Sequence, residues 1–317
     1  MPGMRAVFAQ SIDPDDPLTG LVLGERPEPQ APAGWETVRV SASSLNHHDI
    51  WSLRGVGLPA NRLPMILGCD AVAQRADGTR VLVHAVIPDE GDPRGFSLLS
   101  EKHPGTFAEY VAVPSANLVA LPASLSTMDA VTLPTAWLTA YRMLTTKGRI
   151  AEGNSVLVQG AGGGVATAAV ILAHAMGKRV YATSRDPIKR ERIQGLGASS
   201  FEPGARLPER VDVVIETVGA ATFDHSLKCA APGARIVVSG GTSGQVAEVL
   251  LPRVFMMELS ILGSSMGTVE ELKALVKLVA EKNVRPVVDE VFDFADARRA
   301  FEKLHSGEVF GKLILKH

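Results

Sequence analysis

The chain of 317 residues is predicted to be an α/β protein, with a mostly-β domain followed by a doubly wound parallel sheet. Before about residue 125, short apolar runs alternate with turns rich in Pro and Gly. After it, apolar strands alternate with helical segments. The length also favours two domains, because single cores rarely grow beyond ~250–300 residues.

The first region has the pattern of an irregular β domain. Four short apolar runs are expected to be strands, and the polar, turn-rich stretch 89–104 is expected to be a surface loop. The four runs are 5–9, 36–41, 80–84 and 107–113.

The second region alternates strands and helices, which predicts a parallel sheet covered by helices on both faces. Its expected strands are 155–159, 179–183, 211–216 and 235–239, and its expected helices are 165–176 and 187–196. The tail is expected to form helices at 269–281 and 296–305 and a strand at 312–315, and to pack back on the first domain.

Composition and charge exclude several classes of protein. A net charge of −2 disfavours general nucleic-acid binding, and no apolar run approaches the ~20 residues of a membrane span. No signal peptide is recognisable at the N-terminus, so a cytoplasmic location is expected. Two cysteines, Cys69 and Cys229, cannot form a disulfide framework or a four-cysteine zinc site.

The glycine-rich turn GAGGGV carries the clearest chemical signal. It follows a predicted strand and opens a predicted helix, so its backbone can approach a pyrophosphate whose charge faces the helix start. The predicted dinucleotide contacts are Gly160, Ala161, Gly162, Gly163, Gly164 and Val165.

The end of the next strand predicts which dinucleotide binds. Ser184 and Arg185 stand where NAD-binding units commonly carry an acid, and Lys189 follows one helical turn later. These side chains can bind a 2′-phosphate, so NADPH is expected, although solvated surface charges would give the same pattern. Asp186 keeps NAD as an alternative, because a shift of one residue would make it the ribose-binding acid.

Several segments resemble the medium-chain dehydrogenase/reductases, in the zinc-free branch that includes quinone oxidoreductases. They are SSLNHHDIW, LPMILGCDAVA, GTFAEYVAVP, LTAYRML, VDVVIETVG, ILGSSMG and FGKLILKH, together with the glycine-rich turn. The resemblance implies a GroES-like catalytic domain over 1–125, completed by 267–317, and a Rossmann NADP(H)-binding domain over 126–266.

The resemblance also indicates whether zinc is present. Asn46, Cys69 and Asp70 occupy the positions at which the zinc alcohol dehydrogenases carry Cys, His and Glu ligands. Asn is a poor zinc ligand, and the 89–104 loop lacks the four cysteines of the structural zinc lobe. No metal is therefore expected, with a site built from Cys69, Asp70 and a nearby His as the alternative.

The remaining site residues follow from the resemblance. Asn46, His48 and Trp51 are the catalytic candidates: an amide donor, a proton shuttle and a flat pocket wall. An ordinary polar role for His48 and a core role for Trp51 remain open. The further cofactor candidates are His47, Thr139, Gly241, Thr242, Ser265, Met266 and Lys312.

Together these features predict an NADPH-dependent, zinc-independent reductase of a quinone or an α,β-unsaturated carbonyl. The alternatives are an alcohol dehydrogenase with an atypical metal site and a dinucleotide-binding redox sensor with little turnover. A homodimer is expected, with the edge strand at 259–264 pairing across a two-fold axis.

Overall fold

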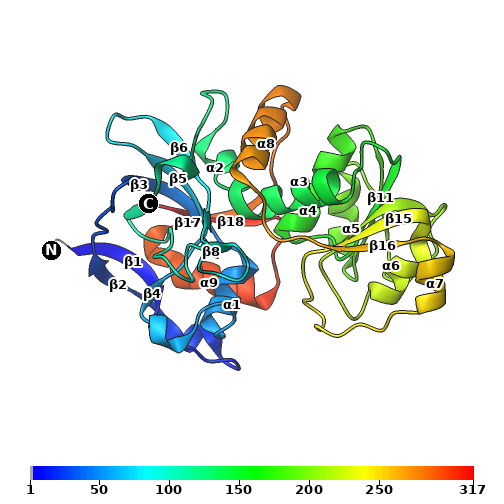
Figure 1. Cartoon of the computed structure of the whole chain (residues 1–317), viewed down its shortest axis with the longest axis horizontal. Helices are drawn as coiled ribbons and strands as arrows, with labels where there is room; N and C mark the ends of the chain where they lie inside the picture. Colours follow the sequence, from blue (N-terminus) through cyan, green and yellow to red (C-terminus); the bar gives the residue numbers. More distant parts are fainter. Residues whose placement is uncertain (1–2) are drawn as a thin grey trace. The chain divides into compact units, whose positions relative to one another are not determined.

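The computed structural model describes residues 3–317 and divides into two compact units (Figure 1). The first unit contains the chain up to residue 135 together with 268–280 and 288–317. The second contains 136–267 and 281–287. The first division lies about ten residues beyond the expected position, after the short helix α2 (Thr127–Ala130).

A seven-stranded sheet built around one long strand organises the first unit. Strand β3 (Trp35–Ser44) pairs antiparallel with β5, β9 and the C-terminal strand β18. The sheet order is β10-β6-β5-β3-β18-β17, with β9 on β3. The other strands are β5 (Asp70–Gln74), β6 (Arg80–Val83), β9 (Tyr110–Pro114), β10 (Leu118–Ala120), β17 (Val288–Asp293) and β18 (Lys312–Lys316).

Two smaller sheets complete the β structure of this unit. Strands β1 (Gly3–Ala9), β2 (Leu21–Pro27) and β4 (Met65–Ile66) form one, and β7 (Val86–Pro88) and β8 (Phe96–Leu98) form the other. Strand β8 lies within the stretch that was expected to be a surface loop, and that expectation was wrong. Leu98, Leu99 and Ser100 are buried, because this short apolar run packs inward between two polar flanks.

The helices of the first unit cover its core. Phe107 and Phe301 meet edge to face at 5.8 Å in a cluster that also contains Leu53 and Leu67. The helices are α1 (His47–Leu53), α8 (Val269–Lys282) and α9 (Ala297–Ser306), with 3₁₀ turns at Pro17–Gly20, Ala60–Arg62, Ser115–Asn117 and Phe294–Asp296.

The second unit is built on six parallel strands in the order β13-β12-β11-β14-β15-β16. The chain moves outward from β11 to β13 and then returns to β14, which places a topological switch point between β11 and β14. Ligands of such sheets bind at the carboxyl ends of the strands beside this point. The strands are β11 (Ser155–Val158), β12 (Arg179–Thr183), β13 (Ser199–Phe201), β14 (Val211–Glu216), β15 (Ala230–Val238) and β16 (Ser260–Gly263).

Helix α4 (Gly164–Ala175) is largely buried, as its run of Ala, Val and Leu predicts. The remaining helical segments are α3 (Leu138–Arg142), α5 (Pro187–Gln194), α6 (Phe223–Cys229) and α7 (Leu251–Met256), with π-helical turns at Leu133–Trp137 and Met143–Lys147.

Among the described residues, no helix is both long and apolar enough to cross a membrane.

Candidate active site

The turn between β11 and α4 requires glycine for steric reasons. Gly160 has a φ of +68°, and a Cβ there would lie 2.3 Å from Val218 Cγ2. Gly162 has a φ of +137°, and a Cβ there would lie 2.9 Å from Lys189 Cδ. Side chains are strained in this backbone region at both positions, and at Gly160 the Val218 side chain also leaves no space, so glycine is required for the turn to form.

Two of the turn's N–H groups hold the turn to β12. Gly160 N donates to Thr183 Oγ1 at 3.3 Å, and Ala161 N donates to the Thr183 carbonyl at 2.7 Å. Beyond them, α4 begins at Gly164 with no side chain capping it, and nothing lies within 4 Å of a Cβ built at Gly163. The first N–H groups of a helix lack intrahelical partners, so this end fits a pyrophosphate.

The end of β12 presents cations, and its acid is already engaged. Asp186 Oδ1 accepts the N–H groups of Ile188 at 2.8 Å and Lys189 at 3.3 Å, so it caps helix α5. Arg185 is exposed, and Ser184 is buried beside it. Ser184 and Arg185 therefore lie where the sequence predicted the 2′-phosphate contact, and that contact stays a prediction.

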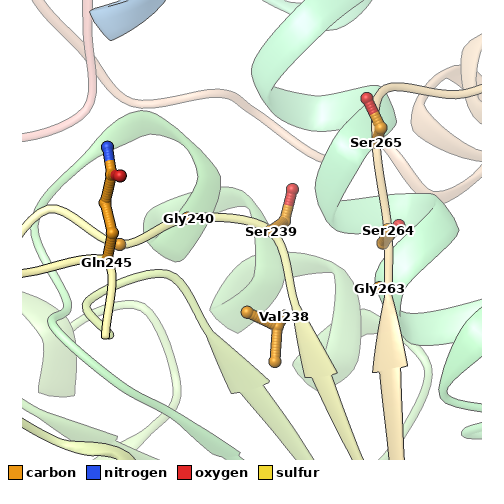
Figure 2. Close-up of a pocket in the computed structure, with 8 residues that line it drawn as sticks. Val238, Ser239, Gly240, Gln245, Gly263, Ser264 and Ser265 are labelled. Carbon is orange, nitrogen blue, oxygen red and sulfur yellow. The ribbon is translucent and has the colours of Figure 1, made fainter. Parts of the chain in front are cut away.

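A pocket of about 570 Å³ opens at the carboxyl ends of β15 and β16 (Figure 2). It brings together two predicted residues, Gly241 and Ser265, while Thr242 and Met266 do not line it. Its other lining residues include Ser264, which precedes the predicted Ser265, and also Ser239 and Gln245, which the sequence analysis missed. Their position at strand ends was the available signal.

One buried hydroxyl of the second unit has no hydrogen-bond partner among the described residues. Ser264 Oγ is buried, and it neither accepts nor donates a hydrogen bond in the described part of the chain. Thr139 is buried on α3, which packs against α4. Buried hydroxyls normally have partners, so Ser264 is a candidate contact for a ligand in the pocket.

In the first unit, a buried polar cluster surrounds Asp70. Its Oδ2 atom accepts from Ser44 Oγ at 2.6 Å, Asn46 Nδ2 at 2.9 Å and Lys312 Nζ at 3.3 Å. Lys312 Nζ also donates to the Leu45 carbonyl and to Asn46 Oδ1, both at 2.6 Å. The three protons of the Lys312 ammonium are therefore directed at three oxygens inside this unit.

The contacts in this cluster bear on the roles predicted for Asn46 and Lys312. The Asn46 amide holds both Asp70 and Lys312, so it organises the cluster. The pyrophosphate contact expected for Lys312 stays a prediction, and it would require the ammonium to exchange one of its present partners.

The residues at the positions where zinc alcohol dehydrogenases carry their metal ligands do not fit a zinc ion. Asn46 is no ligand, and the Lys312 ammonium already supplies positive charge beside the Asp70 carboxylate. Asp70 Oδ1 is buried without a partner. Even so, within residues 3–317 no three His, Cys, Asp or Glu side chains are arranged to hold a metal ion.

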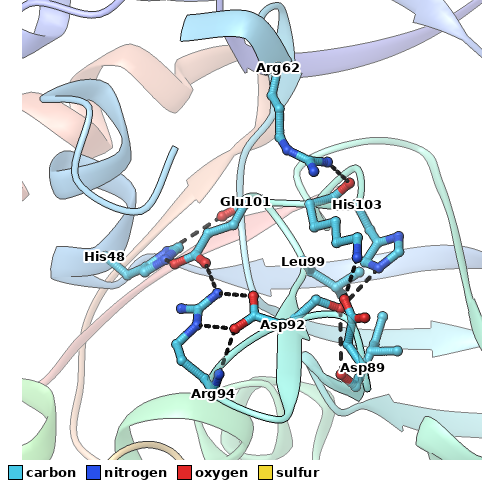
Figure 3. A network of polar contacts seen from close by, with 12 residues as sticks. His48, Arg62, Asp89, Asp92, Arg94, Leu99, Glu101 and His103 are labelled. Carbon is cyan, nitrogen blue, oxygen red and sulfur yellow. Dashed lines mark hydrogen bonds and ion pairs between the residues drawn. The ribbon is translucent and has the colours of Figure 1, made fainter. Parts of the chain in front are cut away.

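His48 lies on α1, where its ring contacts the carboxylate of Glu101 (Figure 3) and, on the other side, the thiol of Cys69. Its Nε2 atom is 3.0 Å from Glu101 Oε1, and its Nδ1 atom is 3.6 Å from Cys69 Sγ. Burial alone would lower the pKa of His48, but Cys69, Glu101 and the Asp49 charge outweigh it and hold that pKa well above 6.5. Burial raises the pKa of the Cys69 thiol, while the neighbouring His48 opposes this shift.

The other residues of α1 have different environments. Asp49 is fully buried, which raises its pKa to about 6, and it accepts the Asn46 N–H at 2.7 Å. Trp51 is partly exposed, and its contact with substrate stays a prediction. His47 is exposed. Sequence reasoning missed Glu101, because nothing local links it to a histidine 53 positions away.

These features are typical of a dinucleotide-dependent oxidoreductase: a Rossmann sheet with a glycine-rich turn, and a β domain in which a histidine pairs with a buried carboxylate. Comparison with known proteins agrees. Residues 32–123 match the alcohol dehydrogenase GroES-like domain, and residues 191–315 match a zinc-binding dehydrogenase domain.

Individual relatives cover nearly the whole chain. An acryloyl-coenzyme A reductase of Metallosphaera sedula is 29% identical over 93% of this chain and 96% of its own length. A zinc-type alcohol dehydrogenase-like protein of Schizosaccharomyces pombe is 30% identical over 88% of this chain and 90% of its own. The structure of an NAD-dependent alcohol dehydrogenase superposes with a TM-score of 0.89 at 31% identity, over 99% and 100% of the two chains.

The chain therefore belongs to the medium-chain dehydrogenase/reductase superfamily, and the resemblance that its sequence motifs indicated is confirmed. The predicted fold class, a GroES-like domain plus a Rossmann domain, is confirmed as well.

Proposed function

We propose that this protein is an NADPH-dependent, zinc-independent oxidoreductase that reduces an α,β-unsaturated carbonyl compound, with an unsaturated acyl thioester as the preferred class and a quinone as the second. The observation that carries the proposal is the Asp70 cluster. The Asn46 amide and the Lys312 ammonium bind the Asp70 carboxylate, which a catalytic metal would need as a ligand. Without such a metal, protein groups must handle the charge and the proton.

The residues divide the work as follows. When bound, the dinucleotide supplies a hydride to the substrate. The glycine-rich turn and the start of α4 hold its pyrophosphate, and Ser184, Arg185 and Lys189 hold the 2′-phosphate. In the first unit, His48 supplies the proton that balances the hydride. Asn46 and Lys312 hold the Asp70 carboxylate in place.

The relatives support the substrate class without establishing it. Two of them are acryloyl-coenzyme A reductases, 29% and 27% identical to this chain. A similar structure belongs to an NAD-dependent alcohol dehydrogenase, so NADH and an alcohol substrate are the alternatives to test. Asp186 argues against NADH, because its carboxylate caps α5.

A substrate panel tests the proposal. NADPH oxidation is measured with crotonyl-CoA, acryloyl-CoA and a benzoquinone, and NADP⁺ reduction is measured with primary and secondary alcohols. We expect turnover with at least one unsaturated acceptor and little with alcohols. Efficient alcohol oxidation, or NADPH binding without any turnover, would overturn the proposal in favour of the dehydrogenase or the redox-sensing alternative.

We also propose a homodimer formed through the edge strand β16. This strand ends the six-stranded sheet, and large apolar side chains are exposed on it and on the preceding segment. They are Val246, Leu250, Leu251, Phe255, Met256 and Ile261. An unpaired edge beside an apolar surface favours pairing with a second copy. Light scattering should give twice the mass of one chain, and a monomer at micromolar concentration would contradict this.

A further inference from the structure

The segment that connects β7 to β9 carries a charge network that ends on His48 (Figure 3). Arg94 donates to Asp92 through Nε at 3.0 Å and through Nη2 at 3.1 Å. Arg94 Nη2 also donates to Glu101 Oε2 at 3.1 Å. The other Glu101 oxygen contacts His48 Nε2 at 3.0 Å. Positive and negative groups therefore alternate from Asp92 to His48.

The two nitrogens of His48 have different partners. An ionised carboxylate only accepts hydrogen bonds, so Nε2 must carry a proton toward Glu101. Nδ1 faces Cys69 Sγ at 3.6 Å and Ser100 Oγ at 3.4 Å, and each of these groups can donate or accept. Glu101 thus fixes the orientation of the ring and leaves Nδ1 as the nitrogen whose proton can move.

The burial of Glu101 indicates a functional role for its carboxylate, because a contribution to the stability of the fold does not explain it. Its side chain is only 7% exposed, whereas that of His48 is 19% exposed and can exchange protons with solvent. Burying a carboxylate is unfavourable by several kcal/mol, and a buried ion pair seldom recovers more than this. Ser100, which precedes Glu101 in the chain, has a φ of +63°, which is a strained conformation for a non-glycine residue.

The surrounding charges keep this pair ionised. The groups that face His48 are Glu101, Cys69 and Asp49. Burial tends to raise the pKa of Glu101, but His48 and Arg94 outweigh it and hold that pKa below 4.5. Near neutral pH, an imidazolium therefore faces a carboxylate that Arg94 holds from behind.

We propose that Glu101 is the positioning residue for His48, with Arg94 as its support, and that His48 Nδ1 delivers the proton taken up by the substrate's α-carbon. This rests on the proposed function. The Nδ1–H bond breaks and a C–H bond forms at the carbon adjacent to the carbonyl, while the hydride has been added at the β-carbon. His48 becomes neutral, keeps its Nε2 proton on Glu101, and regains the lost proton from water. A carboxylate that orients an imidazole and stabilises its charged form acts in the same way in the Ser-His-Asp triad.

Glu101→Gln in the full-length protein tests the pairing by NMR titration of the His48 ring, labelled with ¹³C. We expect the pKa of His48 to fall markedly in this variant, because the carboxylate that pairs with the imidazolium is lost. In Arg94→Met that pKa should not fall, because this variant removes a nearby positive charge and leaves Glu101 in place. Lys102→Met is the matched control, because it removes the Asp89–Lys102 ion pair of the same segment, which does not touch His48. An unchanged His48 titration in Glu101→Gln overturns the proposal.

The dependence of kcat on pH tests the proton step. With NADPH and crotonyl-CoA, the wild type should lose activity only as the pH rises through the raised pKa of His48. Glu101→Gln should lower kcat by roughly 10²-fold and move this limb to lower pH, while the KM for crotonyl-CoA changes little. Lys102→Met should retain the wild-type profile.

These assays distinguish failure of the positioning role of Glu101 from failure of the proposed function. A normal kcat–pH profile in Glu101→Gln overturns the positioning role. A wild type that turns over none of the acceptors overturns the proposed function and the proton step together, whereas the NMR titration still decides whether Glu101 positions His48.

Discussion

At the scale of single residues, we expect the end of β12 to set the preference between the two dinucleotides. Arg185 is exposed there, while Asp186 caps α5. We predict that Arg185→Ala weakens NADPH binding by about 10- to 100-fold, because a hydrogen bond to a charged group contributes roughly 1.5–3 kcal/mol. NADH binding should change little. Titration calorimetry with both dinucleotides measures this, with Arg206→Ala as an exposed control in the same unit. Equal weakening for both dinucleotides would contradict the phosphate assignment.

Residue-level reasoning succeeded where the constraint is local. The glycine-rich turn was predictable because positive φ values and close backbone approach restrict Gly160 and Gly162 themselves. Glu101 was not predictable, since its role arises only when the fold brings it to His48. Lys312 was assigned from resemblance alone, and its burial against Asn46 and Asp70 depends on the pairing of β18 with β3.

At the scale of elements, the loop after β14 depends on one buried carboxylate. Glu216 Oε1 accepts the N–H groups of Val218 at 2.8 Å and Gly219 at 3.0 Å, and Oε2 accepts from Ser226 at 2.6 Å. We predict that Glu216→Gln destabilises the protein by about 2 kcal/mol, because an amide NH₂ would face donors. Urea denaturation measures the change, and Glu202→Gln on the surface is the control. A difference below about 0.5 kcal/mol would contradict this account.

The order of elements was largely predictable, but their pairing was not. Alternating strands and helices indicated the parallel sheet, since each strand–helix–strand unit imposes that geometry. The run 107–113 was expected to form one strand. Instead Ala108 bridges to Ala6 of β1, and Tyr110–Pro114 pairs with β3 as β9. Such a split depends on partners that are distant in sequence.

At the scale of the whole molecule, His84 makes stability sensitive to acid. Burial lowers its pKa to about 4, despite the opposing charges of Glu270 and Glu271. The unfolded chain binds this proton near pH 6.5, so stability falls as the pH drops from 6.5 and the loss is complete below about 4. The loss is on the order of 3 kcal/mol. His84→Leu should flatten the pH dependence of the free energy of unfolding in this window, whereas exposed His305→Gln should not. A slope equal to the wild type in His84→Leu would contradict the assignment.

The central claim is that protein groups, and not a metal, support the reduction. The most direct measurement is kcat for NADPH-dependent reduction of crotonyl-CoA by enzyme dialysed against a strong chelator, with and without added zinc, and with bound zinc quantified in each sample. The account predicts the same kcat in both samples and no stoichiometric zinc in the dialysed enzyme. Activity that disappears on dialysis and returns with one zinc per chain would contradict it.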